Sequence, residues 1–66
     1  MTLLQHLADA YVRAHEVVLD WHMAHPGQSM PHQVEAYAVL MAALHDHATR
    51  IHGAPVDLPS LARETT

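Results

Sequence analysis

Residues 30–52 read MPHQVEAYAVLMAALHDHATRIH, and this stretch decides the fold. Its apolar residues recur at alternating spacings of three and four: Val34, Tyr37, Met41, Leu44, Ala48 and Ile51. This period predicts an α-helix with one buried seam, over about residues 31–52. The central part, AYAVLMAAL at positions 36–44, has no polar side-chain group other than a tyrosine hydroxyl. Because a helix that is apolar all round needs neighbours on more than one side, this helix cannot stand alone.

A similar helix is predicted before it, over about residues 2–25. Its seam has the same spacing: Leu4, Leu7, Tyr11, Ala14, Val18 and Trp21. Pro26 and Gly27 favour a break, so residues 26–30 are expected to form a turn. Gly53 followed by Pro55 is typical of the end of a helix. Folding the two helices antiparallel about the turn sets Ala14 opposite Met41, which predicts a helical hairpin for residues 1–53.

Residues 54–66 have a different pattern and are predicted to form a C-terminal tail. Val56, Leu58 and Leu61 stand among prolines and polar residues, without a long helical period. We expect this tail to be extended, or to form one short helical turn over residues 59–63.

A chain of 66 residues without cysteine has few ways to complete a hydrophobic core. Domains of this size are marginal as single molecules unless a disulfide, a metal or a partner chain stabilises them. Seven apolar residues outside the seams are predicted to form an interface: Leu3, Val12, Val17, Leu19, Val39, Leu40 and Ala43. We therefore expect an all-α hairpin that dimerises into a four-helix bundle. The alternatives are a monomer whose tail covers these residues, and a hairpin that docks on a larger protein.

The number of cations and the length of the apolar runs argue against two classes of partner, nucleic acids and membranes. The chain has three arginines, no lysine and seven carboxylates, for a net charge of −4. Too few cations are present to follow a phosphate backbone, so direct nucleic-acid binding is not expected. No apolar run approaches the roughly 20 residues of a membrane span. We therefore expect no membrane contact and a cytoplasmic location.

Eight histidines are the unusual feature of the composition. His22 and His25 are three residues apart on one helix, and His32 could approach them across the turn. These three residues are the candidate site for zinc or another divalent transition metal; otherwise no cofactor is expected. A second hypothesis is a pH switch, because four histidines border the two seams: His15, His22, His45 and His52. The simpler reading is that the histidines are solvated surface residues.

The sequence offers little for catalysis. Cysteine and lysine nucleophiles are absent, Ser29 and Ser60 have no convincing base, and no glycine-rich phosphate loop occurs. The chain is therefore not expected to be an enzyme. Trp21, Met23 and Met30 fall near the turn, and soft methionines beside an aromatic ring predict an adaptable protein-binding surface.

These observations favour a small, non-enzymatic, homodimeric interaction module that binds and modulates, most simply inhibits, a larger partner protein. Antagonists and adaptors encoded by phages, plasmids or regulatory operons are often of this size. One alternative is a histidine-based protein that binds a metal or another small ligand. Another is an acidic, antitoxin-like or nucleic-acid-mimicking inhibitor of a basic surface.

Overall fold

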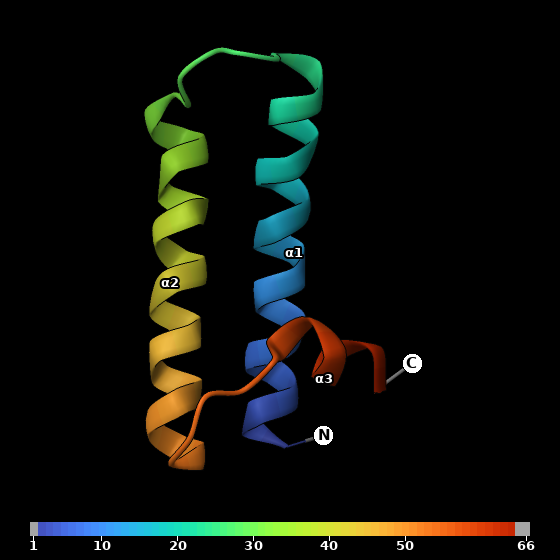
Figure 1. The fold of residues 1–66 in the computed structure, drawn as a ribbon, viewed down its shortest axis with the longest axis vertical. Coiled ribbons are helices and arrows are strands. Elements are labelled where there is room, and N and C mark those ends of the chain that lie inside the picture. The colour runs from blue at the N-terminus through green and yellow to red at the C-terminus, as the bar shows by residue number, and fades with distance from the viewer. Residues whose placement is uncertain (1, 65–66) are drawn as a thin grey trace.

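Three helices account for the fold of the part of the chain that the computed structural model describes, residues 2–64. They are α1 (Leu3–Ala24), α2 (His32–His52) and α3 (Leu58–Glu64). Figure 1 shows that α1 and α2 lie side by side in opposite directions, while α3 lies against α1, near the N-terminal end of α1. The prediction of an all-α hairpin is confirmed. Residue 1 of the predicted hairpin and residues 65 and 66 of the predicted tail lie outside the described residues.

The start and the end of α1 are both fixed by local hydrogen bonds. At the start, the Gln5 amide donates to Thr2 Oγ1 at 3.2 Å and the Thr2 amide donates to Gln5 Oε1 at 2.7 Å. This reciprocal capping box pairs two amides that would otherwise have no partner in the helix. At the end, His25 leaves the helical region while its amide still donates to the Trp21 carbonyl at 2.9 Å. Gly27 then adopts a φ of +77°, which lets the chain turn.

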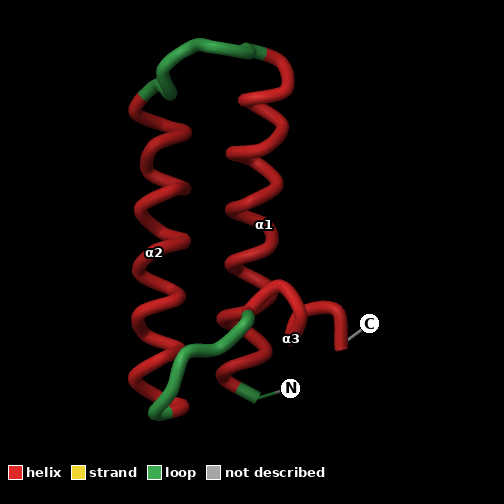
Figure 2. The backbone as a smooth tube through the Cα atoms, viewed as in Figure 1, coloured by secondary structure: helices red, strands yellow, loops and turns green. Residues whose placement is uncertain are grey.

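The boundaries of α2 depend on a proline and a glycine. Pro31 directly precedes the helix, and its carbonyl accepts from the Glu35 amide at 2.9 Å. The Glu35 carboxylate also lies in the first turn, at the positive end of the helix dipole. Gly53 ends the helix in the left-handed region, with φ +84°, and its amide donates to the Thr49 carbonyl at 2.8 Å. The chain then continues as a short loop to α3 (Figure 2).

The core is small and consists mostly of alanine. The buried apolar residues of the described chain are Ala8, Ala14, Val34, Ala48 and Leu58. Leu58, from α3, is the large side chain among them that is fully buried, and it packs in one cluster with Ala8 of α1 and Ala48 of α2. Half-buried side chains surround this cluster: Leu4, Leu7, Tyr11, Leu44, Val56, Leu61 and Ala62. The three helices therefore meet where small alanines leave room for one leucine.

The tail is more ordered than a single helical turn, and it changes what is buried on α2. Residues 58–64 form a seven-residue helix instead of a turn limited to residues 59–63. All predicted seam residues of α1 are buried or half-buried, but on α2 Tyr37 and Ile51 stay 41% and 44% exposed while Ala38 is half-buried. The reason is that α3 covers one side of the hairpin, and no element among the described residues 2–64 covers the flank that carries Tyr37 and Ile51.

Replacing Leu58 by alanine should destabilise the whole molecule. The change leaves a cavity in the cluster with Ala8 and Ala48, so the free energy of unfolding should fall by about 2–5 kcal/mol. Urea unfolding followed by circular dichroism at constant protein concentration measures this. The control is Val39→Ala, at a residue that is 63% exposed; its effect should stay within about 0.5 kcal/mol. Equal effects of the two substitutions would contradict the assignment of Leu58 to the core.

Candidate functional site

The described residues form no pocket, and no helix among them is long and apolar enough to cross a membrane. The notable feature of their surface is a set of large apolar side chains that are more than one third exposed. They are Leu3 (56%), Val17 (38%), Leu19 (48%), Met23 (73%), Tyr37 (41%), Val39 (63%), Leu40 (43%) and Ile51 (44%). Apolar side chains that cluster at a surface mark interaction sites, so their arrangement decides what the molecule can bind.

Five of these side chains lie on one side of the hairpin. We call this side the open face and define it by two rows of residues spaced seven apart, together with Leu40: Leu3, Ala10, Val17 and Ala24 on α1, and Tyr37, Leu44 and Ile51 on α2. The two rows occupy equivalent positions on their helices, because Val17 comes three residues after Ala14 and Leu44 comes three residues after Met41, and the predicted register sets Ala14 opposite Met41. The two helices of an antiparallel pair are related by a local twofold axis perpendicular to the plane of the pair. Equivalent offsets therefore point to the same side.

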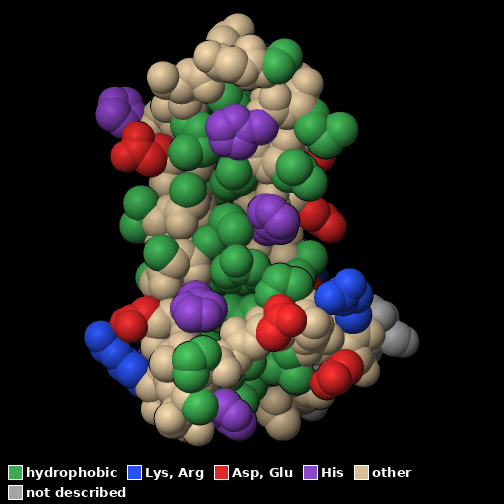
Figure 3. Space-filling model, viewed as in Figure 1, with side chains coloured by type: hydrophobic (Ala, Val, Ile, Leu, Met, Phe, Trp, Pro, Cys, Tyr) green, Lys and Arg blue, Asp and Glu red, His purple; other side chains and the backbone are tan. Residues whose placement is uncertain are grey.

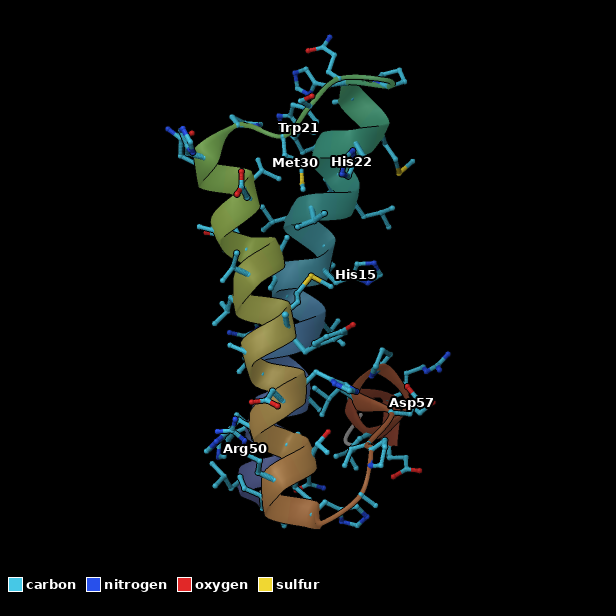
Figure 4. The ribbon with its side chains drawn as sticks, turned by 60° about the vertical axis from the view of Figure 1, so that its left-hand side comes forward. His15, Trp21, His22, Met30, Arg50 and Asp57 are labelled. Atoms are coloured by element: carbon cyan, nitrogen blue, oxygen red, sulfur yellow. The ribbon has the colours of Figure 1, made fainter. Side chains whose placement is uncertain are left out.

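The open face is opposite the side on which α3 docks. Ala8 is buried in the cluster that contains Leu58 of α3. Val17 follows Ala8 by nine residues, or about two and a half helical turns, and so points the other way. Figures 1 and 4 place α3 on a single side of the hairpin. The face that carries Val17 is therefore left without a covering element from residues 2–64.

A second apolar surface lies on the side of α1 that faces away from α2. It consists of Val12, Leu19 and Met23, and we call it the outer stripe. Val12 is half-buried, while Leu19 and Met23, four residues apart, are exposed. The seven predicted interface residues are therefore not one surface. Leu3, Val17 and Leu40 belong to the open face, Val12 and Leu19 belong to the outer stripe, and Val39 and Ala43 lie on the outer side of α2.

The predicted partner-binding residues near the turn also separate. Trp21 and Met30 are half-buried and lie together at the turn end (Figure 4). The Trp21 ring stacks on His25, with centroids 4.6 Å apart and planes 17° apart, and it is T-shaped to the His22 ring, with centroids 5.3 Å apart. Met23 follows Trp21 by two residues, about 200° around the helix, and therefore points away from it. Met23 belongs to the outer stripe.

The histidines do not form a metal-binding group in the described residues. His22 and His25 pack against Trp21, and His25 Nδ1 lies 3.0 Å from the Trp21 carbonyl oxygen. His32 is exposed, and because it comes two residues before buried Val34 it points away from α1. Several other histidines line the side that carries α3 (Figure 3), and His15 projects from the hairpin there (Figure 4). The open face contains none in its two rows.

Charged groups pair locally at the surface. Arg13 contacts Asp9 at 3.1 Å and Arg50 contacts Asp46 at 2.9 Å, each one helical turn apart and exposed. Such pairs contribute a few tenths of a kcal/mol. At the start of α3, Ser60 Oγ donates to Asp57 Oδ2 at 2.7 Å and the Ser60 amide donates to Oδ1 at 3.4 Å. These two bonds, the side-chain bond first, hold the pKa of Asp57 below the ordinary 3.8; desolvation opposes them, and the charge of Arg63 lowers the pKa by a smaller amount.

Comparison of the chain with protein families, with curated proteins and with solved structures finds no match.

Two features of the surface were missed from the sequence, although signals for both are present. The spacing of apolar residues places Tyr37 and Ile51 in the seam, yet they also form a row three residues after Val34 and Ala48, which marks a flank. Asp57 precedes Leu58-Pro59-Ser60, and an aspartate three residues before a serine amide, with proline in the first turn, is typical of a helix start.

Lowering the pH should release the start of α3. A lowered pKa for Asp57 in the folded state means that its stabilisation is complete above the ordinary value of 3.8 and is lost as the pH falls through the folded-state pKa. Amide exchange of residues 60–64, measured by NMR at decreasing pH, reports this loss. Asp57→Asn keeps an accepting oxygen but cannot titrate, so the loss that Asp57 causes should be absent from this variant. An unchanged pH profile in Asp57→Asn would contradict the role of Asp57.

Proposed function

We propose that this chain is a cytoplasmic, non-enzymatic protein–protein interaction module. It forms a homodimeric four-helix bundle, and the dimer binds a larger partner protein and inhibits it by covering part of its surface. The observation that supports this proposal is the apolar surface that remains exposed after α3 has docked: the open face and the outer stripe.

The exposed area supports association. A folded monomer of this mass is expected to expose about 4,200 Å², whereas this chain exposes 4654 Å². In the alternative of a self-sufficient monomer, the tail covers the apolar residues outside the seams. Here α3 packs near Leu4, Leu7 and Tyr11, and Val17 and Leu40 remain exposed. Burying such side chains is the main driving force for association.

The two apolar surfaces suit two different occupants. Pairing of hairpins in a four-helix bundle covers one face of each hairpin and leaves the outer surfaces of the helices in water. The open face can therefore be used for self-association while the outer stripe stays available. Leu19 and Met23, one turn apart, are the kind of anchors with which a helix binds an apolar groove. The flexible thioether of Met23 adapts readily to such a groove.

The polar groups that could support other functions are engaged in local structure. Arg13 and Arg50 pair with carboxylates on their own helices, and Arg63 donates to Ser60 Oγ at 3.2 Å. Ser60 itself donates to Asp57 at the start of α3. This arrangement favours protein binding over direct contact with a phosphate backbone, and it gives Ser60 a structural role in capping α3.

Sedimentation equilibrium at micromolar concentration should give the mass of two chains, each of 7.3 kDa. Two molecules gain from association because the open face loses its contact with water. The mass should fall toward that of one chain on dilution. A mass of one chain at all concentrations up to hundreds of micromolar would refute the homodimer.

Binding of the larger partner should depend on the outer stripe. The tagged chain should capture a specific protein from its native host, and Leu19→Glu combined with Met23→Glu should abolish this capture because both anchors become charged. Val39→Glu, at an equally exposed position on α2, should retain it. Capture that survives the double substitution would exclude the outer stripe as the partner-binding surface.

A further inference from the structure

We infer that a second copy of this chain covers the open face, in an arrangement that puts the two interhelical turns at opposite ends of the bundle. This inference rests on the proposed self-association. It adds the face that is used and the relative orientation of the two copies.

The open face has the chemistry of a self-association surface. Its two rows contain no charged residue, and its exposed side chains are aliphatic or aromatic. Polar residues lie along its α1 edge, one residue before the seam positions: His6, Arg13 and Asp20. Arg13 already has Asp9 as its ion-pair partner at 3.1 Å. A second copy with the same net charge of −4 therefore meets an uncharged centre with a polar rim, as at other protein interfaces.

The size of the open face also fits a second copy. The molecule is 36 Å long and 24 Å wide, and a pair of packed helices is about 20 Å across. Two such faces brought together bury about 1,400 Å² in total, within the range of about 1,200–2,000 Å² that stable complexes bury. The open face is thus large enough for a dimer without a contribution from α3.

The pattern of side-chain sizes on α1 selects the orientation. The row Leu3, Ala10, Val17, Ala24 alternates large and small residues at a spacing of seven. When two copies of α1 face each other antiparallel, Leu3 of one copy meets Ala24 of the other and Val17 meets Ala10. Every contact in this row then joins a large side chain to a small one, which allows the two helices to interdigitate.

On α2 the same twofold rotation joins large side chains to one another, so the preference for this orientation comes from the row on α1. The rotation sets Leu40 of one copy beside Leu44 of the other, and Tyr37 beside His47. These contacts are centred at Ala42, and those on α1 are centred between Arg13 and Ala14. Because the predicted register puts Ala14 opposite Met41, the two centres lie at the same height to within about one residue, or about 1.5 Å. A single twofold axis can therefore relate both the α1 contacts and the α2 contacts of the two copies.

The other symmetric arrangement is less favourable. With both turns at the same end, α1 of one copy would face α2 of the other. At the register in which facing residue numbers sum to about 54, Leu3 would then meet Ile51 and Val17 would meet Tyr37, so both large side chains of the α1 row would lose their alanine partners. Only Ala10, facing Leu44, and Ala24, facing Met30, would keep a small side chain opposite a large one. Interdigitation is poorer in this orientation.

Two glutamate substitutions on adjacent residues of α2 test the face. Leu40→Glu places a charge in the open face, so the dimer dissociation constant measured by sedimentation equilibrium should rise at least tenfold. Val39→Glu is the matched control, because Val39 is more exposed than Leu40 and lies on the outer side of α2. It should leave the constant unchanged, and circular dichroism should show that both variants remain helical. A dimer that tolerates Leu40→Glu, or that is weakened equally by Val39→Glu, would overturn the assignment of the face.

A single spin label on the turn tests the orientation without disturbing the face. The chain has no cysteine, so Gln28→Cys, at an exposed position in the turn, gives one label per copy. Pulsed electron resonance on the dimer should give a distance near the 36 Å length of the molecule. A distance near the roughly 20 Å width of a helix pair would show both turns at the same end and would overturn the orientation.

The outcomes separate this inference from the proposed function. A strictly monomeric wild-type chain refutes both the dimer and the face. A dimer with the wrong response to Leu40→Glu, or with a short distance between labels, refutes only the inferred face or orientation and leaves the interaction module in place.

Discussion

The insertion of Leu58 between two alanines is the contact on which the tertiary structure depends. The side chains of Ala8 and Ala48 are single methyl groups, so they leave a space between α1 and α2 that these two helices do not fill. Leu58 comes from α3 and fills it, at 1% exposure. A helix of seven residues is too short to be stable in isolation. The helical structure of α3 therefore depends on the burial of Leu58 in this space. In turn, the apolar residues at the end of the hairpin away from the turn depend on α3 to cover them.

This contact also makes the two sides of the hairpin unequal. Leu58 and its neighbours Val56 and Leu61 cover the side that carries Ala8, while the side that carries Val17 and Leu40 is left to water. Among residues 2–64, α3 and the loop before it are the segments that pack on the hairpin, and they cover one side. The open face and the outer stripe are thus consequences of the same packing that completes the core, and they explain why we propose that the protein acts through association.

Local rules were enough to predict the hairpin but not the packing of its tail. The spacing of apolar residues, together with Pro26, Gly27 and Gly53, predicted both long helices to within one or two residues. The side on which α3 docks could not be predicted, because it depends on a contact between Leu58 and alanines about 10 and 50 residues away along the chain. The exposure of Tyr37 and Ile51 follows from that choice of side. The histidine site at the turn was not assembled, because stacking on Trp21 holds His25 while His32 points outward.

The connection between α2 and α3 has a consequence for the order of folding. The contacts between α1 and α2 nearest the turn close short loops, and such contacts form early because little chain entropy is lost. Leu58 can enter its space only after Ala8 and Ala48 have come together at the far end of the hairpin. We therefore expect α1 and α2 to pair first near the turn and then toward the other end of the hairpin, and α3 to dock last. When the protein unfolds, α3 should be the first element to detach.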